Sequence, residues 1–186
     1  MTPVDDLSDD WLVEQLRTGD RHALALIYDR YKGRLYAFCM RLLRDDAQAQ
    51  DAVHETFLNL FRTAATLEHG GALKTWLYRT ARNEGLQLLR RNGRRADTDP
   101  ETLRAEDTPL SLLDAQDTAT VVRKVLHHLK REYMEVLMLR EFEDLSYAQI
   151  AEITLSTESA VKSRIFKARL ALATRLAPWF AEGRSK

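Results

Sequence analysis

Apolar residues recur at spacings of three and four along most of the chain, and this pattern restricts the fold more than any other feature. A helix places such residues on one face, whereas a half-buried strand needs strict alternation. With only seven Gly and four Pro in 186 residues, few breaks interrupt the pattern. We therefore predict an all-α protein. The longest stripe comprises Leu24, Ile27, Tyr28, Tyr31, Leu35, Phe38, Cys39 and Leu42.

Four helices are predicted in the first half of the chain. Ser8 and Asp20 are expected N-caps for a short helix over 9–17, which Gly19 ends, and for a long helix to about residue 43. The third covers roughly 46–66 and the fourth 72 to about 91. Since the chain has one cysteine, no internal disulfide forms, and Cys39 is expected in the core. The inward residues of the last two helices are predicted as Ala49, Val53, Phe57, Leu60 and Phe61, and as Leu73, Trp76, Leu77, Thr80, Ala81 and Leu88.

The composition changes to Asp, Thr, Pro and Glu between residues 92 and 116, where Pro100 and Pro109 block a helix. We predict two helical domains, at 1–95 and 117–186, joined by a flexible acidic linker at 96–116. Helices are expected over about 117–129, 131–142, 146–153 and 157–177, with Pro178 closing the fold. The last two, joined by a tight turn, predict a helix-turn-helix.

Charge is distributed unevenly, although the formal net charge is zero. Residues 79–95 hold six Arg against one acid, Glu84, and residues 159–175 hold five basic residues and no acid. Residues 97–117 between them hold seven acids and only Arg104. Two basic segments separated by an acidic connector favour two nucleic-acid contacts over two ordinary solvated helix faces.

The last predicted helix has an inward stripe of Val161, Ile165, Ala168 and Leu172. A helix in the major groove reads base edges with side chains near its N-terminus, and Arg or Lys commonly donates to guanine. Lys162, Ser163 and Lys167 are therefore the readout candidates, while Arg164 equally suits a phosphate contact. The full set predicted to face DNA is Ser159, Lys162, Ser163, Arg164, Phe166 and Lys167.

The segment LREFEDLSYAQIAEITLSTESAVKSRIFKARLAL resembles the C-terminal DNA-binding domain of sigma factors, which reads the minus-35 promoter element. Upstream, DAQDAVHETFLNLFR and LKTWLYRTARNEGLQLLRR resemble the N-terminal domain, which binds RNA polymerase and opens the minus-10 element. The resemblance covers about four-fifths of the chain, with both blocks in the right order. The short length and the missing intermediate domain point to the extracytoplasmic-function group of the sigma-70 family.

The resemblance implies how the first domain works. Asn83 would hold a flipped minus-10 base, since an amide both donates and accepts hydrogen bonds. For Trp76 core packing is favoured over stacking, whereas Tyr78 stays a stacking candidate. The third helix would bind the polymerase through Asp51 and Glu55, with Phe57 and Leu60 as apolar anchors, although the sequence pattern on its own predicts Phe57 in the core. The expected minus-10 set is Gly70, Lys74, Tyr78, Arg79, Arg82, Asn83 and Arg90.

Two positions in the helix-turn-helix turn depart from the family pattern. Leu155 stands where Gly, Asn or Asp is frequent, and Ser156 where an apolar residue is common. Since a left-handed conformation strains Leu, we expect the turn to differ locally.

The expected partners are core RNA polymerase, promoter DNA as duplex and melted strand, and, by resemblance, an anti-sigma factor. The resemblance implies that the acidic linker threads towards the polymerase active-site and RNA-exit channel, and the simplest alternative is a passive tether. The acidic N-terminus and the absence of a run of about 20 apolar residues predict a cytoplasmic protein without membrane insertion.

Other functions fit less well. The five His are scattered and no Gly-rich phosphate loop occurs, so we expect no enzyme, no cofactor and no metal site. A helix-turn-helix regulator that binds duplex DNA without polymerase is the main alternative, with the first domain as a sensor or dimerisation module. A protein-interaction adaptor would leave both basic segments without a purpose.

Overall fold

The computed structural model describes residues 7–67, 72–93, 125–126 and 128–182. Within these ranges the regular structure is helical, as predicted, and no strand occurs. The chain divides into two compact units, one built mainly from residues 1–94 and the other mainly from residues 95–186. The predicted linker and most of the predicted 117–129 helix lie outside the described residues.

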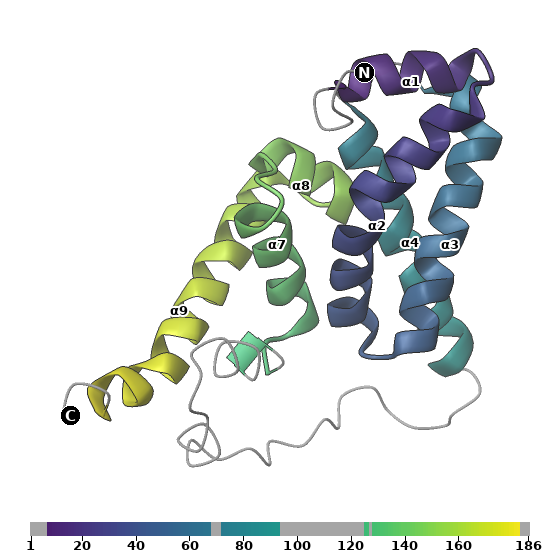
Figure 1. The fold of residues 1–186 in the computed structure, drawn as a ribbon. Helices are drawn as coiled ribbons and strands as arrows, with labels where there is room; N and C mark the ends of the chain where they lie inside the picture. The colour runs from purple at the N-terminus through teal and green to yellow at the C-terminus, as the bar shows by residue number, and fades with distance from the viewer. Residues whose placement is uncertain (1–6, 68–71, 94–124, 127, 183–186) are drawn as a thin grey trace. The chain divides into compact units, whose positions relative to one another are not determined.

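The N-terminal unit contains α1 (Asp9–Arg17), α2 (Arg21–Leu43), α3 (Asp46–Thr63), the short 3-10 helix η2 (Ala64–Thr66) and α4 (Leu73–Gly93) (Figure 1). Both predicted N-caps are confirmed. The Ser8 hydroxyl accepts from the Trp11 amide at 3.2 Å, and the Asp20 carboxylate accepts from the His22 amide at 2.8 Å. Gly19 between them has φ 90°, which Gly adopts without strain, so α1 ends there. The predicted third helix is divided, since its last turn is 3-10.

The core of this unit lies between α2, α3 and α4, because α4 packs against both of the others. Phe38 and Tyr78 meet edge to face, with ring centroids 5.3 Å apart at 84°. Gly85 brings α4 close to α2: a Cβ there would lie 3.2 Å from the Leu42 Cδ2. Cys39 is fully buried, so the prediction that it belongs to the core is confirmed.

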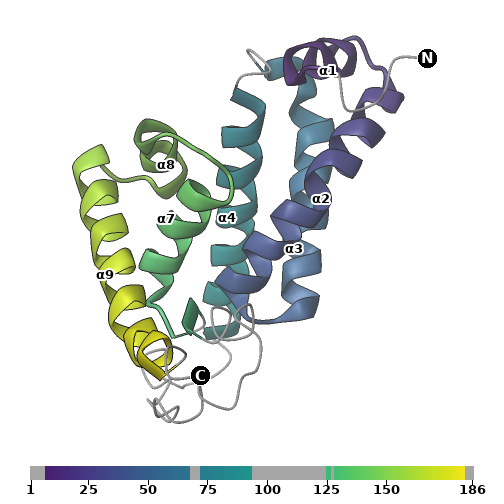
Figure 2. The same ribbon diagram turned by 60° about the vertical axis from the view of Figure 1, so that its left-hand side comes forward.

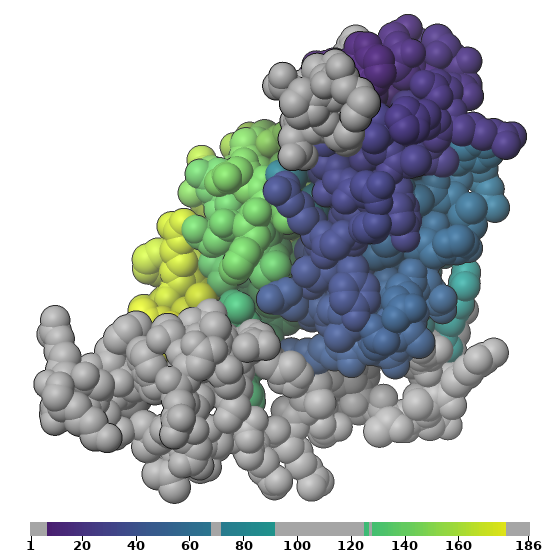
Figure 3. Space-filling view, in the orientation of Figure 1, coloured from purple at the N-terminus to yellow at the C-terminus, as the bar shows by residue number. Residues whose placement is uncertain are grey.

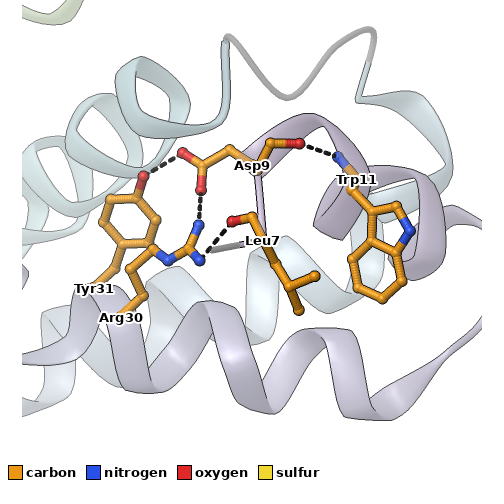
Figure 4. Close-up of polar contacts among 6 residues, drawn as sticks. Leu7, Asp9, Trp11, Arg30 and Tyr31 are labelled. Carbon is orange, nitrogen blue, oxygen red and sulfur yellow. Dashed lines mark hydrogen bonds and ion pairs between the residues drawn. The ribbon is translucent and has the colours of Figure 1, made fainter. Parts of the chain in front are cut away.

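A polar cluster fastens α1 to α2 (Figure 4). The Arg30 guanidinium donates to the Asp9 carboxylate and to the Leu7 carbonyl, both at 2.7 Å, and the Tyr31 hydroxyl donates to the other Asp9 oxygen. The Asp9 and Arg30 side chains are 24% and 25% exposed, so the ion pair is partly shielded from water. Burial and the Asp9 carboxylate raise the pKa of Tyr31, which therefore stays protonated at neutral pH.

The C-terminal unit contains α7 (Arg131–Glu141), α8 (Tyr147–Thr154) and α9 (Glu158–Glu182), and α8 lies across one end of the α7–α9 pair (Figure 2). Three predicted helices are thereby confirmed to within one residue at their starts. A capping box begins α8: the Ser146 hydroxyl accepts from the Gln149 amide at 3.2 Å, and the Gln149 side chain accepts from the Ser146 amide at 2.9 Å. The core is formed by Val136, Leu139, Leu145, Ile150, Ile153, Val161, Ile165 and Ala168.

The prediction that Pro178 closes the fold is wrong, because α9 continues to Glu182. Proline removes one backbone hydrogen bond from a helix, that to the carbonyl four residues earlier. Here that residue is Thr174, which is exposed together with Ala173 and Arg175. Water can therefore satisfy the released carbonyl, and the helix proceeds.

Two aromatic residues assigned to inward stripes are instead exposed. Tyr28 is 42% exposed and its ring packs edge-on against Phe57, at 4.8 Å between centroids. Phe61 is 50% exposed. In each case the preceding residue is the one that is fully buried, Ile27 before Tyr28 and Leu60 before Phe61. In Figure 3 the side chains of α1, α2 and α3 form a continuous surface on this face of the unit.

Candidate nucleic-acid interface

The recognition face of α9 is open to solvent. Val161, Ile165 and Ala168 are at most 2% exposed and fix the rotation of the helix against α7. The side chains on the opposite face can therefore meet a groove, and Phe166, which is 68% exposed, gives them an apolar centre. Of the six residues predicted to face DNA, five are exposed: Ser159, Lys162, Ser163, Phe166 and Lys167.

Arg164 differs from the other five. It is half-buried, and its Nε lies 3.4 Å from the Glu132 carboxylate of α7. The side chain thus holds the recognition helix against its support. This contact weakens the case for Arg164 as a phosphate ligand, which needs the guanidinium free to reach outward.

The turn before α9 adopts the conformation that the sequence argued against. Leu155 has φ 51°, in the left-handed region, so the expected local departure of the turn is wrong. The Ser156 amide donates to the Ala151 carbonyl at 2.9 Å and the Leu155 amide to the Glu152 carbonyl at 3.4 Å, the pattern of a Schellman motif. The Leu155 side chain is 75% exposed. The strain of this conformation, about 1–2 kcal/mol for an L-residue, is offset by these hydrogen bonds.

The face of α4 predicted to hold the melted strand is only partly open. Asn83 and Arg90 are exposed, so an amide and a guanidinium are available there. Lys74, Arg79 and Arg82 are half-buried, as is Trp76, which fits the favoured packing role for that ring. Gly70 lies outside the described residues.

The prediction that Tyr78 is a stacking surface is wrong. Its ring is 0% exposed and packs against Phe38 within the core of the N-terminal unit. Residues 77 and 78 are both buried, so the buried arc of α4 is wider than the sequence stripe indicated.

Glu84, the single acid of the first basic segment, is held towards α3. The Asn59 side-chain amide donates to the Glu84 carboxylate at 3.1 Å. The interaction turns the one negative group of this stretch towards protein, while Asn83 beside it faces solvent. Nothing in the sequence pattern signalled this pair, because residues 59 and 84 belong to different helices.

The predicted polymerase-binding residues of α3 separate into two groups. Asp51 and Glu55 are exposed, as an interface requires. Phe57 and Leu60 are 7% and 0% exposed, so their assignment as surface anchors is wrong and they belong to the core. Phe61, which the stripe placed inward, is 50% exposed on the same helix, and the Arg62 guanidinium lies 4.0 Å from the Glu55 carboxylate.

Burial raises the pKa of the Cys39 thiol to about 12, so it is not a thiolate at neutral pH and offers no nucleophile. Among the residues that the structure describes, no three His, Cys, Asp or Glu side chains gather as a metal site would require. In the same part of the chain, none of the helices combines the length and hydropathy needed to cross a bilayer.

Two segments of the chain match known protein families. Residues 27–95 match the family Sigma-70 region 2, and residues 120–172 match Sigma-70, region 4. The chain is 31% identical to the RNA polymerase sigma-H factor of Pseudomonas aeruginosa, with 94% of this chain and 96% of that protein covered. The chain belongs to the extracytoplasmic-function group of the sigma-70 family. It is thus an RNA polymerase sigma factor, a subunit that directs transcription initiation.

Other relatives place this sigma factor in the same group. It is 32% identical to the ECF RNA polymerase sigma-E factor of Haemophilus influenzae, over 94% of this chain and 98% of the relative. The solved sigma factor RpoE of Bartonella quintana, in complex with the anti-sigma factor NepR, matches with a TM-score of 0.63 and 26% identity, over 81% of this chain and 96% of that one. CnrH, in complex with the cytosolic domain of CnrY, shares the fold at a TM-score of 0.67 and 22% identity, over 91% and 97%.

Proposed function

We propose that α9 reads the minus-35 element as duplex and that α4 holds the opened minus-10 element. The observation that carries this proposal is the exposed row on α9, where two lysines, a serine and Phe166 stand opposite a fully buried stripe. The Lys162 and Lys167 ammonium groups donate hydrogen bonds of the kind that guanine accepts, and the Phe166 ring provides an apolar contact for the methyl group of thymine. Ser163 between them donates or accepts.

On α4 the exposed pair is Asn83 and Arg90. An amide pairs with the edge of an extruded base, and Arg90 neutralises a backbone phosphate of the separated strand. The inward-held Glu84 carboxylate supports this assignment, since it keeps the negative charge away from phosphates. The half-buried Lys74, Arg79 and Arg82 are proposed as further backbone contacts.

The remaining assignments follow the family. The polymerase surface is proposed on α3, at Asp51, Glu55 and the exposed Phe61. The domain limits stay 1–95 for polymerase binding and minus-10 recognition, 96–116 for the acidic linker and 117–186 for minus-35 recognition. The protein acts in the cytoplasm without catalysis of its own. Its matches to sigma factors solved with anti-sigma partners support a proteinaceous inhibitor that binds this chain too.

Run-off transcription from a promoter library, with bacterial core RNA polymerase and with or without this chain, tests the proposal. Initiation that is sequence-selective only with the protein supports it. Lys162→Ala and Lys167→Ala should weaken duplex binding upstream by about 1–3 kcal/mol each and relax the preference at the base pair that each lysine contacts. Asn83→Ala should instead slow opening, seen as permanganate reactivity of unpaired thymines, with little change in duplex affinity. Equal effects on both steps from all three variants would refute the division of labour.

Lys130→Ala is the matched control for the charge change, because Lys130 is an exposed lysine of the same unit outside both candidate surfaces. For polymerase binding, Phe61→Ala should reduce affinity for core enzyme, whereas Phe166→Ala should reduce DNA binding alone. The two exposed phenylalanines therefore control for each other. Tight duplex binding without polymerase, together with no initiation, would favour the regulator alternative.

A further inference from the structure

Two cations from two different helices lie over the ring of Tyr147, the first residue of α8. The Arg140 guanidinium carbon, in the last turn of α7, is 5.2 Å from the ring centroid. The Lys162 ammonium nitrogen, on the recognition helix α9, is 5.6 Å from it. Both distances fall within the range of about 6 Å over which an aromatic face attracts a cation. One half-buried ring thus joins all three helices of this unit.

The two cations are held differently. Arg140 also donates to the Leu145 carbonyl at 2.8 Å, so it is fixed to the loop between α7 and α8 by a hydrogen bond as well as by the ring. Lys162 is exposed, and within the described part of the chain its ammonium group contacts the Tyr147 ring. The Tyr147 ring therefore contacts a fixed arginine of α7, Arg140, and a candidate DNA-reading lysine of α9, Lys162.

We infer that Tyr147 is a positioning residue for promoter recognition, which holds the Lys162 ammonium over its ring so that Lys162 meets its base already ordered. The inference rests on the proposed minus-35 function of α9. A lysine side chain is flexible and loses part of its rotamer entropy on binding. An ammonium over a π-face keeps N–H donors available for a guanine. The ring thus orders the side chain in the free protein and leaves its chemistry intact.

The inference assigns the effect to the ring and not to the hydroxyl. Tyr147→Phe keeps the aromatic face and should bind as the wild type does. Tyr147→Leu removes the face and should bind roughly two- to fivefold more weakly, the range of an exposed cation–π contact. The loss should concentrate at the base pair whose preference Lys162→Met also changes, because the same ammonium is involved.

The test uses the full chain with core RNA polymerase and a promoter taken from the run-off selection. Affinity and base preference in the minus-35 element are measured for the wild type, Tyr147→Phe, Tyr147→Leu, Lys162→Met and the Tyr147→Leu/Lys162→Met pair. Tyr147→Leu should have no further effect once Lys162 is Met. Phenylalanines with increasing fluorine content at position 147 keep the shape of the ring while weakening its negative face, so affinity should fall with each fluorine. This series guards against a Leu variant that folds poorly.

Four outcomes would overturn the inference. A Tyr147→Phe loss as large as that of Tyr147→Leu would place the effect on the hydroxyl. An equal loss from Tyr147→Leu in the presence and absence of Lys162 would show a purely structural role through Arg140. If the affinity does not change with fluorination of the ring, the negative face of the ring does not hold Lys162. If the wild-type holoenzyme itself shows no minus-35 preference, the proposed function fails first; if it does and the variants match it, only the inference fails.

Discussion

The two basic helices carry similar charge but differ in how they meet the rest of their units. α9 packs chiefly against α7, so a narrow stripe of Val161, Ile165 and Ala168 is buried and the opposite side is open. α4 packs against both α2 and α3, and its buried arc includes Leu77 and Tyr78 side by side in sequence. A helix with one main neighbour exposes most of its surface, whereas a helix with two exposes little. Surface residues are thus more readily assigned on α9 than on α4.

The sharpest test of this difference compares an aromatic residue from each helix. Tyr78→Ala removes a fully buried ring and should lower the free energy of unfolding by about 3–5 kcal/mol. Phe166→Ala, at a site 68% exposed, should change it by less than about 0.5 kcal/mol while weakening DNA binding. Urea denaturation followed by circular dichroism measures both. Tyr78→Phe, which keeps the ring against Phe38, is the control, and similar values for both Ala variants would refute the contrast.

Local signals in the sequence predicted the helix boundaries well. Ser8 and Asp20 cap their helices through side-chain bonds to the next turn, and these bonds depend only on nearby residues. Ser146 with Gln149 begins α8 in the same way, within one residue of the predicted start. The stripe of α9 was likewise sufficient to identify its buried residues, apart from Leu172, which is half-buried.

Features that depend on partners distant in sequence could not be predicted. Tyr78 is buried because α4 packs against both α2 and α3, and periodicity within one helix does not show how many neighbours it has. The apolar stripe of α3 did predict that Phe57 and Leu60 face inward, and their assignment as surface anchors came from the resemblance. The Asn59–Glu84 hydrogen bond and the Tyr147 ring contacts join separate helices, so no spacing reveals them. Leu155 takes a conformation that its side chain disfavours, since the Schellman bonds outweigh the local preference.

Two polar contacts within the N-terminal unit should also differ in strength. Asp9→Ala should lower the free energy of unfolding by about 1.5–3 kcal/mol, because it leaves the partly shielded Arg30 and Tyr31 without their shared acceptor. Asp29→Ala removes a carboxylate paired with Lys32 on the exposed side of α2, at 66% and 47% exposure, and should have almost no effect. Urea unfolding at neutral pH and low salt measures both. A loss from Asp9→Ala no larger than from Asp29→Ala would show that the cluster does not stabilise the unit.

Alkaline pH should weaken the N-terminal unit. Burial raises the pKa of Cys39 from 9.0 to about 12, so above pH 9 the unfolded chain loses this proton while the folded chain keeps it. The free energy of unfolding should therefore be highest below pH 9 and should fall above it, by up to about 1.4 kcal/mol per pH unit from this group. Tyr31, whose pKa is also raised, adds a fall in the same direction above pH 10.

Tryptophan fluorescence during urea unfolding follows the N-terminal unit once Trp179 of α9 is replaced by Phe, since the other two tryptophans, Trp11 and Trp76, both lie in that unit. Cys39→Ala is the matched variant, and its unfolding free energy should vary less between pH 8.5 and 10 than that of the wild type. The comparison uses slopes, so the constant cost of the substitution cancels. Identical slopes would mean that Cys39 titrates alike in the folded and unfolded chain.

The smallest effect is expected from the ion pair that joins α7 to α9. The Arg169 guanidinium donates to the Glu141 carboxylate at 2.6 Å and 3.2 Å, and the pair raises the pKa of Arg169. The two side chains are 55% and 43% exposed, so water and salt screen their attraction. A double-mutant cycle with Glu141→Ala and Arg169→Ala should give a coupling of about 0.2–1 kcal/mol that declines between low and high salt. The short distances alone would suggest a stronger bond, but exposure decides, because solvent competes for both groups. A salt-independent coupling as large as the Asp9 effect would show that α9 depends on α7 through polar contacts and not through its buried stripe.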